Sequence, residues 1–390
     1  MKLFTPEPFS TERRHGLHTL GALGLAAAAA PLAWAGKDDE IVIGQSVPLS
    51  GVLADTGREM MMGGAVYFEH VNSQGGIQGR KIRHVVLDDG YEVERTVANT
   101  RELLEKYNAL ALFGYAGTGN IQRLLSDRVL ADANVAMVGP YTGGEPLRSP
   151  YNPYIFHIRA GYGDEAAAMV KMLTSVGITR IGVMYQDDAF GQSGLQGVVA
   201  ALQAHKLELL VSASYPKNTD QVDAAVQIIA AKQPQAVILI SVNKSSAAFV
   251  LKYRALSKSA QILNISVVTP QAITGIAGLT DTRGVAIAQV VPDPLSNALP
   301  VAREYRTVLA THGRGMRPSS TSFEEYLAAK TLVEGIRRAK SLNRLSVMAA
   351  LESIDRLDLG GFTVGFGPGN RVGSRFVEIA TVGRDGKLVR

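Results

Sequence analysis

Short apolar runs alternate with amphipathic segments along the chain after residue 40. Met61, Ala65, Phe68 and Val71 recur with the 3.6-residue period of a helix, and Gly75-Gly76 follows as a stop signal. The runs rich in Val, Ile and Leu predict strands. A first series therefore has strands at 41–44, 81–87, 109–113 and 135–138, with helices at 58–72, 92–107 and 119–132 between them.

A second series of the same kind begins near residue 154. Its expected strands are 154–158, 180–185, 207–215 and 236–240, and its expected helices are 164–176, 193–205, 220–231 and 244–256. Nearly continuous apolar strands between helices favour a parallel sheet that is covered on both faces. Two such series predict an α/β protein with two lobes.

The tail has a different pattern. Helices are expected at 297–313, 320–341 and 344–353, followed by strand-like segments at 362–366 and 375–382. A segment this helical does not repeat the pattern of either series. We therefore expect the tail to complete the first two lobes.

Residues 1–35 have the organisation of a signal peptide. Arg13 and Arg14 precede an apolar run at 20–30, and Ala33-Trp34-Ala35 is a small-x-small cleavage site. The run is too short to span the roughly 30 Å of bilayer hydrocarbon. We expect export and cleavage near Gly36, by either the general or the twin-arginine route. A lipid anchor of the usual bacterial kind is excluded because the chain has no cysteine.

Composition narrows the function classes. The chain has 390 residues, of which 46% are hydrophobic and 19% charged, which suffices for two domains. The absence of cysteine removes disulfides, thiolate metal sites and cysteine nucleophiles. The net charge of +5 is not gathered into a basic stripe, so nucleic acid is not an expected partner.

Catalytic and cofactor motifs are also absent from the sequence. The histidines after residue 35 have no metal-ligand spacing, and neither a G-x-S-x-G elbow nor a Walker lysine motif occurs. The acidic pairs Asp88-Asp89 and Asp187-Asp188 each follow a predicted strand, where Asp commonly caps a helix or lies in a loop. We predict a protein that is not an enzyme, with no catalytic residues, no metal site and no cofactor.

Several segments together resemble the branched-chain amino-acid-binding family of periplasmic proteins, the type I class of ABC-importer receptors. The matching segments, in the family's order, are I-V-I-G-Q-S-V-P-L-S-G at 41–51, N-S-Q-G-G-I-Q-G-R-K at 72–81 with Asp88-Asp89, the loops 114–120 and 138–143, and Y-Q-D-D-A-F-G at 185–191. The resemblance covers residues 41–382.

The resemblance implies a type I periplasmic-binding-protein fold, with two doubly wound parallel-sheet lobes, three crossover segments and a ligand cleft between the lobes. Lobe 1 would comprise 38–158 plus 292–362, and lobe 2 would comprise 160–288 plus 363–390. The implied function is a monomeric periplasmic receptor that passes a small polar ligand to the membrane permease of an ABC importer. The alternative is the ligand-sensing subunit of a signalling system with the same fold.

Ligands of open α/β sheets bind beyond the carboxyl ends of the strands, and the candidate residues follow predicted strands there. In lobe 1 these are Thr118, Gly119 and Asn120 after one strand, and Tyr141 and Thr142 after the next. A helix starting at this point offers free N–H groups to an anion. The resemblance implies that the two loops hold the ligand carboxylate. The same residues could instead be ordinary caps and turns.

In lobe 2 the resemblance aligns Phe190 with an aromatic residue that folds over the ligand, although Phe190 could instead pack in the core. Tyr185 and Asp187 lie near it in the sequence, and Val242-Asn243 and Ser266 follow two later strands.

The chain departs from the family at Ser266. Amino-acid binders usually have a carboxylate there to pair with the ligand ammonium, and a buried ammonium without a partner is costly. Asp187 or Asp55 could substitute. Otherwise the ligand is a small carboxylate or an amide without an amino group.

Overall fold

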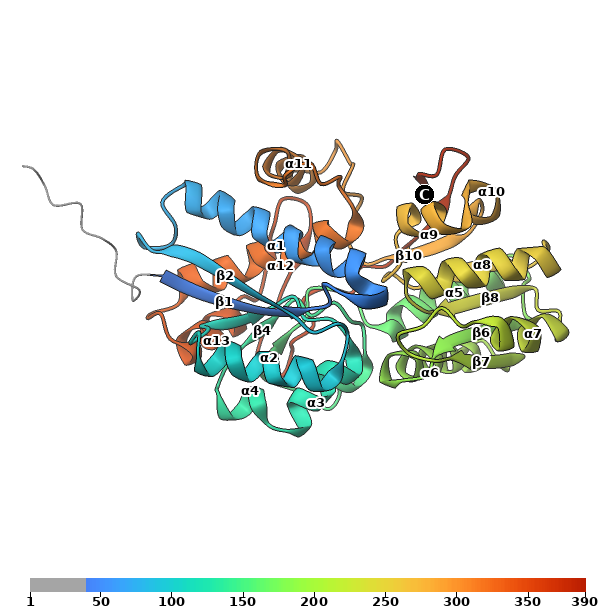
Figure 1. Cartoon of the computed structure of the whole chain (residues 1–390), viewed down its shortest axis with the longest axis horizontal. Helices are drawn as coiled ribbons and strands as arrows, with labels where there is room; N and C mark the ends of the chain where they lie inside the picture. Colours follow the sequence, from blue (N-terminus) through green and yellow to red (C-terminus); the bar gives the residue numbers. More distant parts are fainter. Residues whose placement is uncertain (1–39) are drawn as a thin grey trace, which may run out of the picture. The chain divides into compact units, whose positions relative to one another are not determined.

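A five-stranded parallel sheet forms the centre of the first lobe in the computed structural model, which describes residues 40–390 (Figure 1). Its order is β2-β1-β3-β4-β5, and Ile43 of β1 lies opposite both His84 and Ala111. The strands are β1 (Glu40–Val47), β2 (Lys81–Asp88), β3 (Ala111–Phe113), β4 (Met137–Val138) and β5 (Ile155–Phe156).

Successive side chains along these strands point to opposite faces of the sheet, so the first lobe has two cores. Phe113 and Val138 pack with the helices of one face, whereas their neighbours Leu112 and Met137 pack with the helices of the other. The first face carries α1 (Ala54–Ser73), α11 (Pro300–His312), α12 (Ser320–Arg338) and α13 (Arg344–Glu352). The second carries α2 (Val93–Glu105), α3 (Thr118–Ser126) and α4 (Val129–Asp132). Helices on both faces explain why the strands read as nearly continuous apolar runs.

The second lobe has a seven-stranded sheet in the order β14-β13-β10-β9-β8-β6-β7. The parallel strands are β6 (Ile181–Gln186), β7 (Val211–Tyr215), β8 (Ala236–Ile240), β9 (Gln261–Asn264) and β10 (Ala286–Gln289). Two antiparallel strands, β13 (Glu378–Val382) and β14 (Leu388–Val389), complete one edge.

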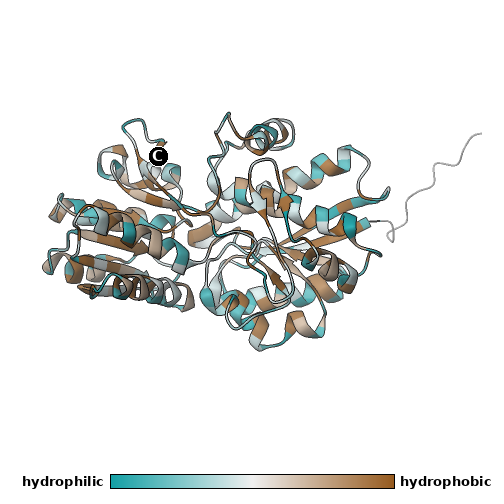
Figure 2. Cartoon of the chain, turned by 180° about the vertical axis from the view of Figure 1, so that it is seen from behind, coloured by the Kyte–Doolittle hydropathy of each residue, from teal (hydrophilic) through white to brown (hydrophobic). Residues whose placement is uncertain are grey.

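Helices cover both faces of this sheet as well. Val183 and Ile238 pack toward α5 (Tyr162–Ser175) and α6 (Ala189–Ala204). Their neighbours Met184 and Val237 pack toward α7 (Asp223–Ala231), α8 (Asn243–Leu256), α9 (Pro270–Ala277) and α10 (Leu279–Thr282). Figure 2 shows the same division, with mostly apolar strands inside and helices that carry both apolar and polar residues.

Within the described residues the chain crosses between the two sheets three times, after β5, after β10 and before β13. The last crossing comes later than the boundary expected at 362/363. The hairpin of β11 (Leu357–Asp358) and β12 (Thr363–Val364) ends with Val364 and Phe366 buried in the core of the first lobe. Phe366 packs edge-on against Phe156 of β5, 5.2 Å between ring centroids. Its apolar ring therefore keeps this segment with lobe 1.

Other departures from the expected elements are local. The helix expected at 119–132 is divided into α3 and α4, because Arg128 has a left-handed backbone with φ 57°. The helix expected at 58–72 begins earlier, at Ala54, after the short 3-10 helix η2 (Gly51–Leu53). A second 3-10 helix, η3, spans Glu145–Leu147. The expected signal peptide, 1–35, lies outside the described residues.

None of the helices in residues 40–390 is long and apolar enough to cross a bilayer. The same residues contain no group of three or more His, Asp or Glu side chains arranged to hold a metal ion.

Candidate ligand-binding site

A cavity lies where the two lobes meet, with an empty volume of about 340 Å³ that includes open solvent. All of its lining residues follow the carboxyl ends of strands, the place where open α/β sheets bind ligands. The first lobe contributes Pro48, Leu53, Thr56, Tyr91, Ala116, Gly117, Thr118 and Tyr141. The second contributes Tyr162, Phe190, Val242 and Val267.

Thr118 forms the polar part of the wall in the first lobe. It is the first residue of α3, whose initial N–H groups have no acceptor within the helix. The Thr118 hydroxyl lies 2.6 Å from the hydroxyl of Thr142, which also accepts a 3.1 Å hydrogen bond from the Gly144 N–H. Both threonines are buried. Hydroxyls and free amides at a helix N-terminus together favour a carboxylate or another small anion.

Gly117 lets a ligand come close to the start of α3. Its φ of +93° is rarely adopted by L residues, and a Cβ at this position would lie 2.8 Å from Cε2 of Tyr91. A side chain here would therefore displace the Tyr91 ring from the cavity wall. The glycine leaves the start of α3 open to the cavity.

Four aromatic side chains belong to the remaining wall. Tyr91 and Tyr141 come from lobe 1, and Tyr162 and Phe190 from lobe 2. The rings of Tyr162 and Phe190 pack edge to face, with centroids 5.5 Å apart. Burial raises the pKa of Tyr162 to about 12 and that of Tyr91 well above its usual range, so both phenols are neutral at physiological pH.

Hydrogen bonds between the lobes surround the cavity. Asn243 donates to the Thr56 hydroxyl (3.0 Å), Gln186 donates to the Tyr91 hydroxyl (3.1 Å), and the Glu145 N–H donates to the Ser193 hydroxyl (3.0 Å). The two lobes are therefore in contact around the cavity.

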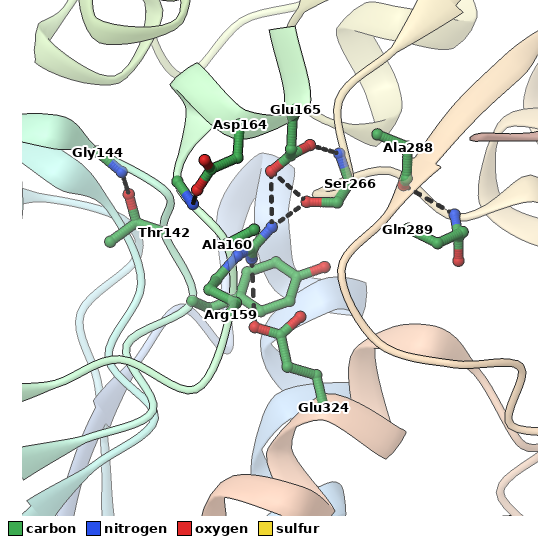
Figure 3. Close-up of polar contacts among 12 residues, drawn as sticks. Thr142, Gly144, Arg159, Ala160, Asp164, Glu165, Ser266, Ala288, Gln289 and Glu324 are labelled. Carbon is green, nitrogen blue, oxygen red and sulfur yellow. Dashed lines mark hydrogen bonds and ion pairs between the residues drawn. The ribbon is translucent and has the colours of Figure 1, made fainter. Parts of the chain in front are cut away.

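A buried charge cluster lies behind Tyr141. The Arg159 guanidinium, in the first crossing, lies over the Tyr141 ring at 5.0 Å from its centroid. It pairs with Glu165 of lobe 2 (3.4 Å) and with Glu324 of lobe 1 (3.3 Å), as Figure 3 shows. Arg159 also donates to the Ser266 hydroxyl. A single cation at the hinge thus holds one carboxylate from each lobe.

Burial is the main influence on the pKa values of the two glutamates in this cluster. It raises the pKa of Glu324 to about 7, against the opposing attraction of Arg159. Burial also raises the pKa of Glu165, which accepts hydrogen bonds from the Ser266 N–H (2.7 Å) and hydroxyl (2.9 Å). Burial alone would lower the pKa of Arg159, but the two glutamates hold it above its usual value.

The structure brings several of the sequence-predicted residues together. Thr118, Tyr141 and Phe190 line the cavity, and Thr142 lies directly behind Thr118. Asn120 is buried beside them, but its amide group is bonded to Thr96 and to Lys217. A Cβ at Gly119 would lie 3.6 Å from that of Ala189, so Gly119 faces α6 of the other lobe.

Other predicted residues do not line the cavity. Tyr185 lies within β6, half-buried against the core of lobe 2. Asp187 is exposed, as is Asp55, which pairs with Arg58. The Ser266 side chain turns to Glu165 and Arg159, and the next residue, Val267, lines the cavity instead.

Sequence reasoning missed Tyr91, Tyr162, Leu53 and Val267 in the wall. Tyr91 could have been found by the rule that selected Thr118, because it follows the carboxyl end of β2. Nothing in the local sequence indicates which of the two adjacent residues, Ser266 or Val267, faces the cavity. The Arg159 cluster was also missed, because Ser266 and Glu324 are far in the sequence from Arg159 and Glu165.

Residues 40–387 match the model of the periplasmic binding protein family, and the chain belongs to this family. A Brucella abortus (strain 2308) protein named Leu/Ile/Val-binding protein homolog 7 is 26% identical over 394 residues, which cover 94% of each chain. A substrate-binding periplasmic protein from Ralstonia solanacearum has 39% identity and a TM-score of 0.86, covering 90% of this chain and 99% of that one. A possible leucine/isoleucine/valine-binding protein from Rhodopirellula baltica has 28% identity and a TM-score of 0.85, with 90% and 97% covered.

These comparisons confirm the predicted resemblance and the type I fold. The family is one of binding receptors that take small ligands and work with ABC permeases. Membership implies an extracytoplasmic location.

Proposed function

We propose that this protein is the periplasmic receptor of an ABC importer and captures a small carboxylate, either an amino acid or a related acid, by closure of its two lobes. The observation that carries the proposal is the cavity between the lobes. Its polar wall, Thr118 at the start of α3, belongs to lobe 1, and its aromatic cover, Phe190 and Tyr162, belongs to lobe 2.

The two walls would act in sequence. Thr118, backed by Thr142, would bind the carboxylate while the lobes are apart, because both residues belong to lobe 1. Phe190 would reach the apolar body of the ligand only after closure. A ligand shifts an equilibrium between two conformations only by its differential affinity for them. The contacts of Phe190 and Tyr162, which require both lobes, would supply that difference.

The names of the relatives support an apolar ligand body. The Brucella and Rhodopirellula proteins are named for leucine, isoleucine and valine. The cavity of this chain has a matching apolar lining from Leu53, Val242 and Val267. We propose release of the unaltered ligand to a membrane permease by a monomeric receptor that performs no catalysis.

A thermal-shift screen tests the proposal. Purified protein would be heated with amino acids, aromatic acids, short branched carboxylates and amides, each at several concentrations. A ligand at about 100 times its dissociation constant adds roughly 2.7 kcal/mol to the free energy of unfolding. Stabilisation by at least one carboxylate is expected, and recovery of that compound unchanged after incubation supports a receptor. The absence of stabilisation by any carboxylate, or conversion of the bound compound, would contradict the proposal.

Export is tested separately. The protein tagged at its C-terminus should accumulate outside the cytoplasm with an N-terminus near Gly36, since Ala33-Trp34-Ala35 precedes that residue. Mass spectrometry of the exported protein measures this. Retention of residues 1–35 on most of the exported material would contradict it.

A further inference from the structure

None of the residues that line the cavity carries a charge. The polar side-chain atoms of the wall are hydroxyls, from Thr56, Thr118 and three tyrosines. Hydroxyls and the N–H groups at the start of α3 can bind a carboxylate. They provide no anionic partner for an ammonium group, whose burial without one is unfavourable.

Carboxylates near the wall are occupied elsewhere. Asp89, next to Tyr91, accepts from the Ser46 hydroxyl (2.8 Å), the Tyr91 N–H (2.9 Å) and the Thr96 hydroxyl (3.1 Å). Asp188 caps α6 through the Gly191 N–H (3.1 Å) and also accepts from Gln186 (2.8 Å). Neither carboxylate lines the cavity.

Two glutamates behind the wall, Glu165 and Glu324, are also committed. Glu165 is held by Ser266 and Arg159, and Glu324 is held by Arg159. The exposed Asp55 and Asp187, which could have paired with an ammonium, do not reach the lining.

Cations, by contrast, lie over two of the rings that line the cavity. The Arg159 guanidinium lies 5.0 Å from the Tyr141 centroid, and the Lys217 ammonium lies 4.2 Å from the Tyr91 centroid. Each cation makes a cation–π contact with the ring beneath it. A ligand ammonium in the cavity would therefore find no anionic partner among the lining residues.

We infer that the cavity selects monocarboxylates that have an apolar or aromatic body and no amino group, and discriminates against the corresponding α-amino acids. This inference rests on the proposed function, because it names the ligand class of the same cavity. The carboxylate binds at Thr118 and the start of α3. The remaining atoms of the ligand contact Leu53, Phe190, Val242 and Val267.

Matched ligand pairs test the inference by isothermal titration calorimetry. The probes are 3-phenylpropanoate against L-phenylalanine, and 4-methylpentanoate against L-leucine, so that each pair differs in the amino group alone. Leaving a buried charged group unpaired is unfavourable, so the acid should bind at least about tenfold more tightly than its amino acid.

Val267 offers a variant that should change this preference. Val267→Asp adds a carboxylate to the lobe 2 wall, and Val267→Asn has almost the same shape without the charge. The ratio of amino-acid to acid affinity should rise by at least about tenfold in V267D relative to V267N, because the new carboxylate can pair with an ammonium. Thermal melting of both variants shows whether they fold. If V267D does not fold, the comparison of the ligand pairs on the wild-type protein still decides the inference.

The outcomes separate the two proposals. Tighter binding of an amino acid than of its matched acid by the wild type would overturn the inference and leave the receptor function standing. Equal affinities within a pair would also overturn it. Binding by neither member of any pair, together with no carboxylate in the wider screen, would overturn both.

Discussion

The hydroxyls of Thr118 and Thr142 lie 2.6 Å apart although the residues are 24 positions apart in the sequence. They follow β3 and β4, which are neighbours in the sheet, so their loops meet at one edge. The pair forms one hydrogen-bonding unit on the wall of the first lobe.

Thr118→Ala should weaken binding of the tightest carboxylate about 10- to 150-fold, because a hydrogen bond to a charged group contributes about 1.5–3 kcal/mol. Thr118→Ser retains the hydroxyl and is the control, with a much smaller loss. Thr142→Ala should also weaken binding, and the double variant should lose less than the sum of the single losses, because contacting residues are not additive. Titration calorimetry measures the four variants and the wild type. Strict additivity, or affinities within twofold of the wild type, would show that this pair does not form the carboxylate site.

Phe190→Ala should increase the ligand dissociation rate more than it lowers the association rate. Phe190 belongs to lobe 2, so its contacts with the ligand are completed only on closure, and affinity changes of this kind are mostly changes in dissociation. Stopped-flow binding measures both rates. Phe376→Ala is the matched control, because Phe376 is exposed and lies in the third crossing, outside the cavity lining. Equal changes in the two variants, or an effect confined to association, would contradict the role of Phe190 in closure.

Glu324 should make the protein less stable as the pH rises from about 4.5 to about 7. Its pKa is raised from 4.5 in the unfolded chain to about 7 by burial, so the folded state binds more protons within this window. The stabilising proton is fully bound below pH 4.5 and is lost as the pH passes the folded pKa.

Glu324→Gln is expected to resemble the wild type most closely at pH 4.5 and to gain relative stability toward pH 8. A shift of this size corresponds to a change on the order of 3 kcal/mol in the free-energy difference between the two proteins. Urea denaturation at several pH values measures it. A difference between wild type and E324Q that is constant across this range would show that Glu324 does not titrate there.

Gly114→Ala should destabilise the first lobe. Gly114 has a φ of +57°, and an added Cβ would lie 2.6 Å from both Gln45 Nε2 and Glu325 Oε2, which are buried. Gly75→Ala is the control, because Gly75 also has a positive φ but its Cβ would meet nothing within 4 Å. The control should lose on the order of 1 kcal/mol of unfolding free energy from backbone strain alone, and G114A should lose more because of the added clash. Similar losses in both variants, measured by chemical denaturation, would rule out the clash.

Much of the fold could be predicted from the order of apolar runs. The runs at 41–44 and 236–240 correspond to β1 and β8, because strands covered on both faces are largely apolar along their length. The rule that ligands bind beyond strand ends also selected Thr118 and Tyr141, and the family resemblance selected Phe190; the structure brings all three to one cavity. These features depend on local sequence and on the direction of the strands, and both can be read from the chain.

Only the tertiary structure decided which side chains face the cavity and which face away. Ser266 and Val267 are adjacent and equally plausible in the sequence, yet the first is bonded to Glu165 and the second lines the cavity. Arg159, Glu165 and Glu324 come from the hinge and from both lobes, and only the packing of the lobes brings them together. Local sequence could not reveal these relationships, because burial and charge pairing depend on residues that are distant in the chain and meet only when the lobes have folded and come together.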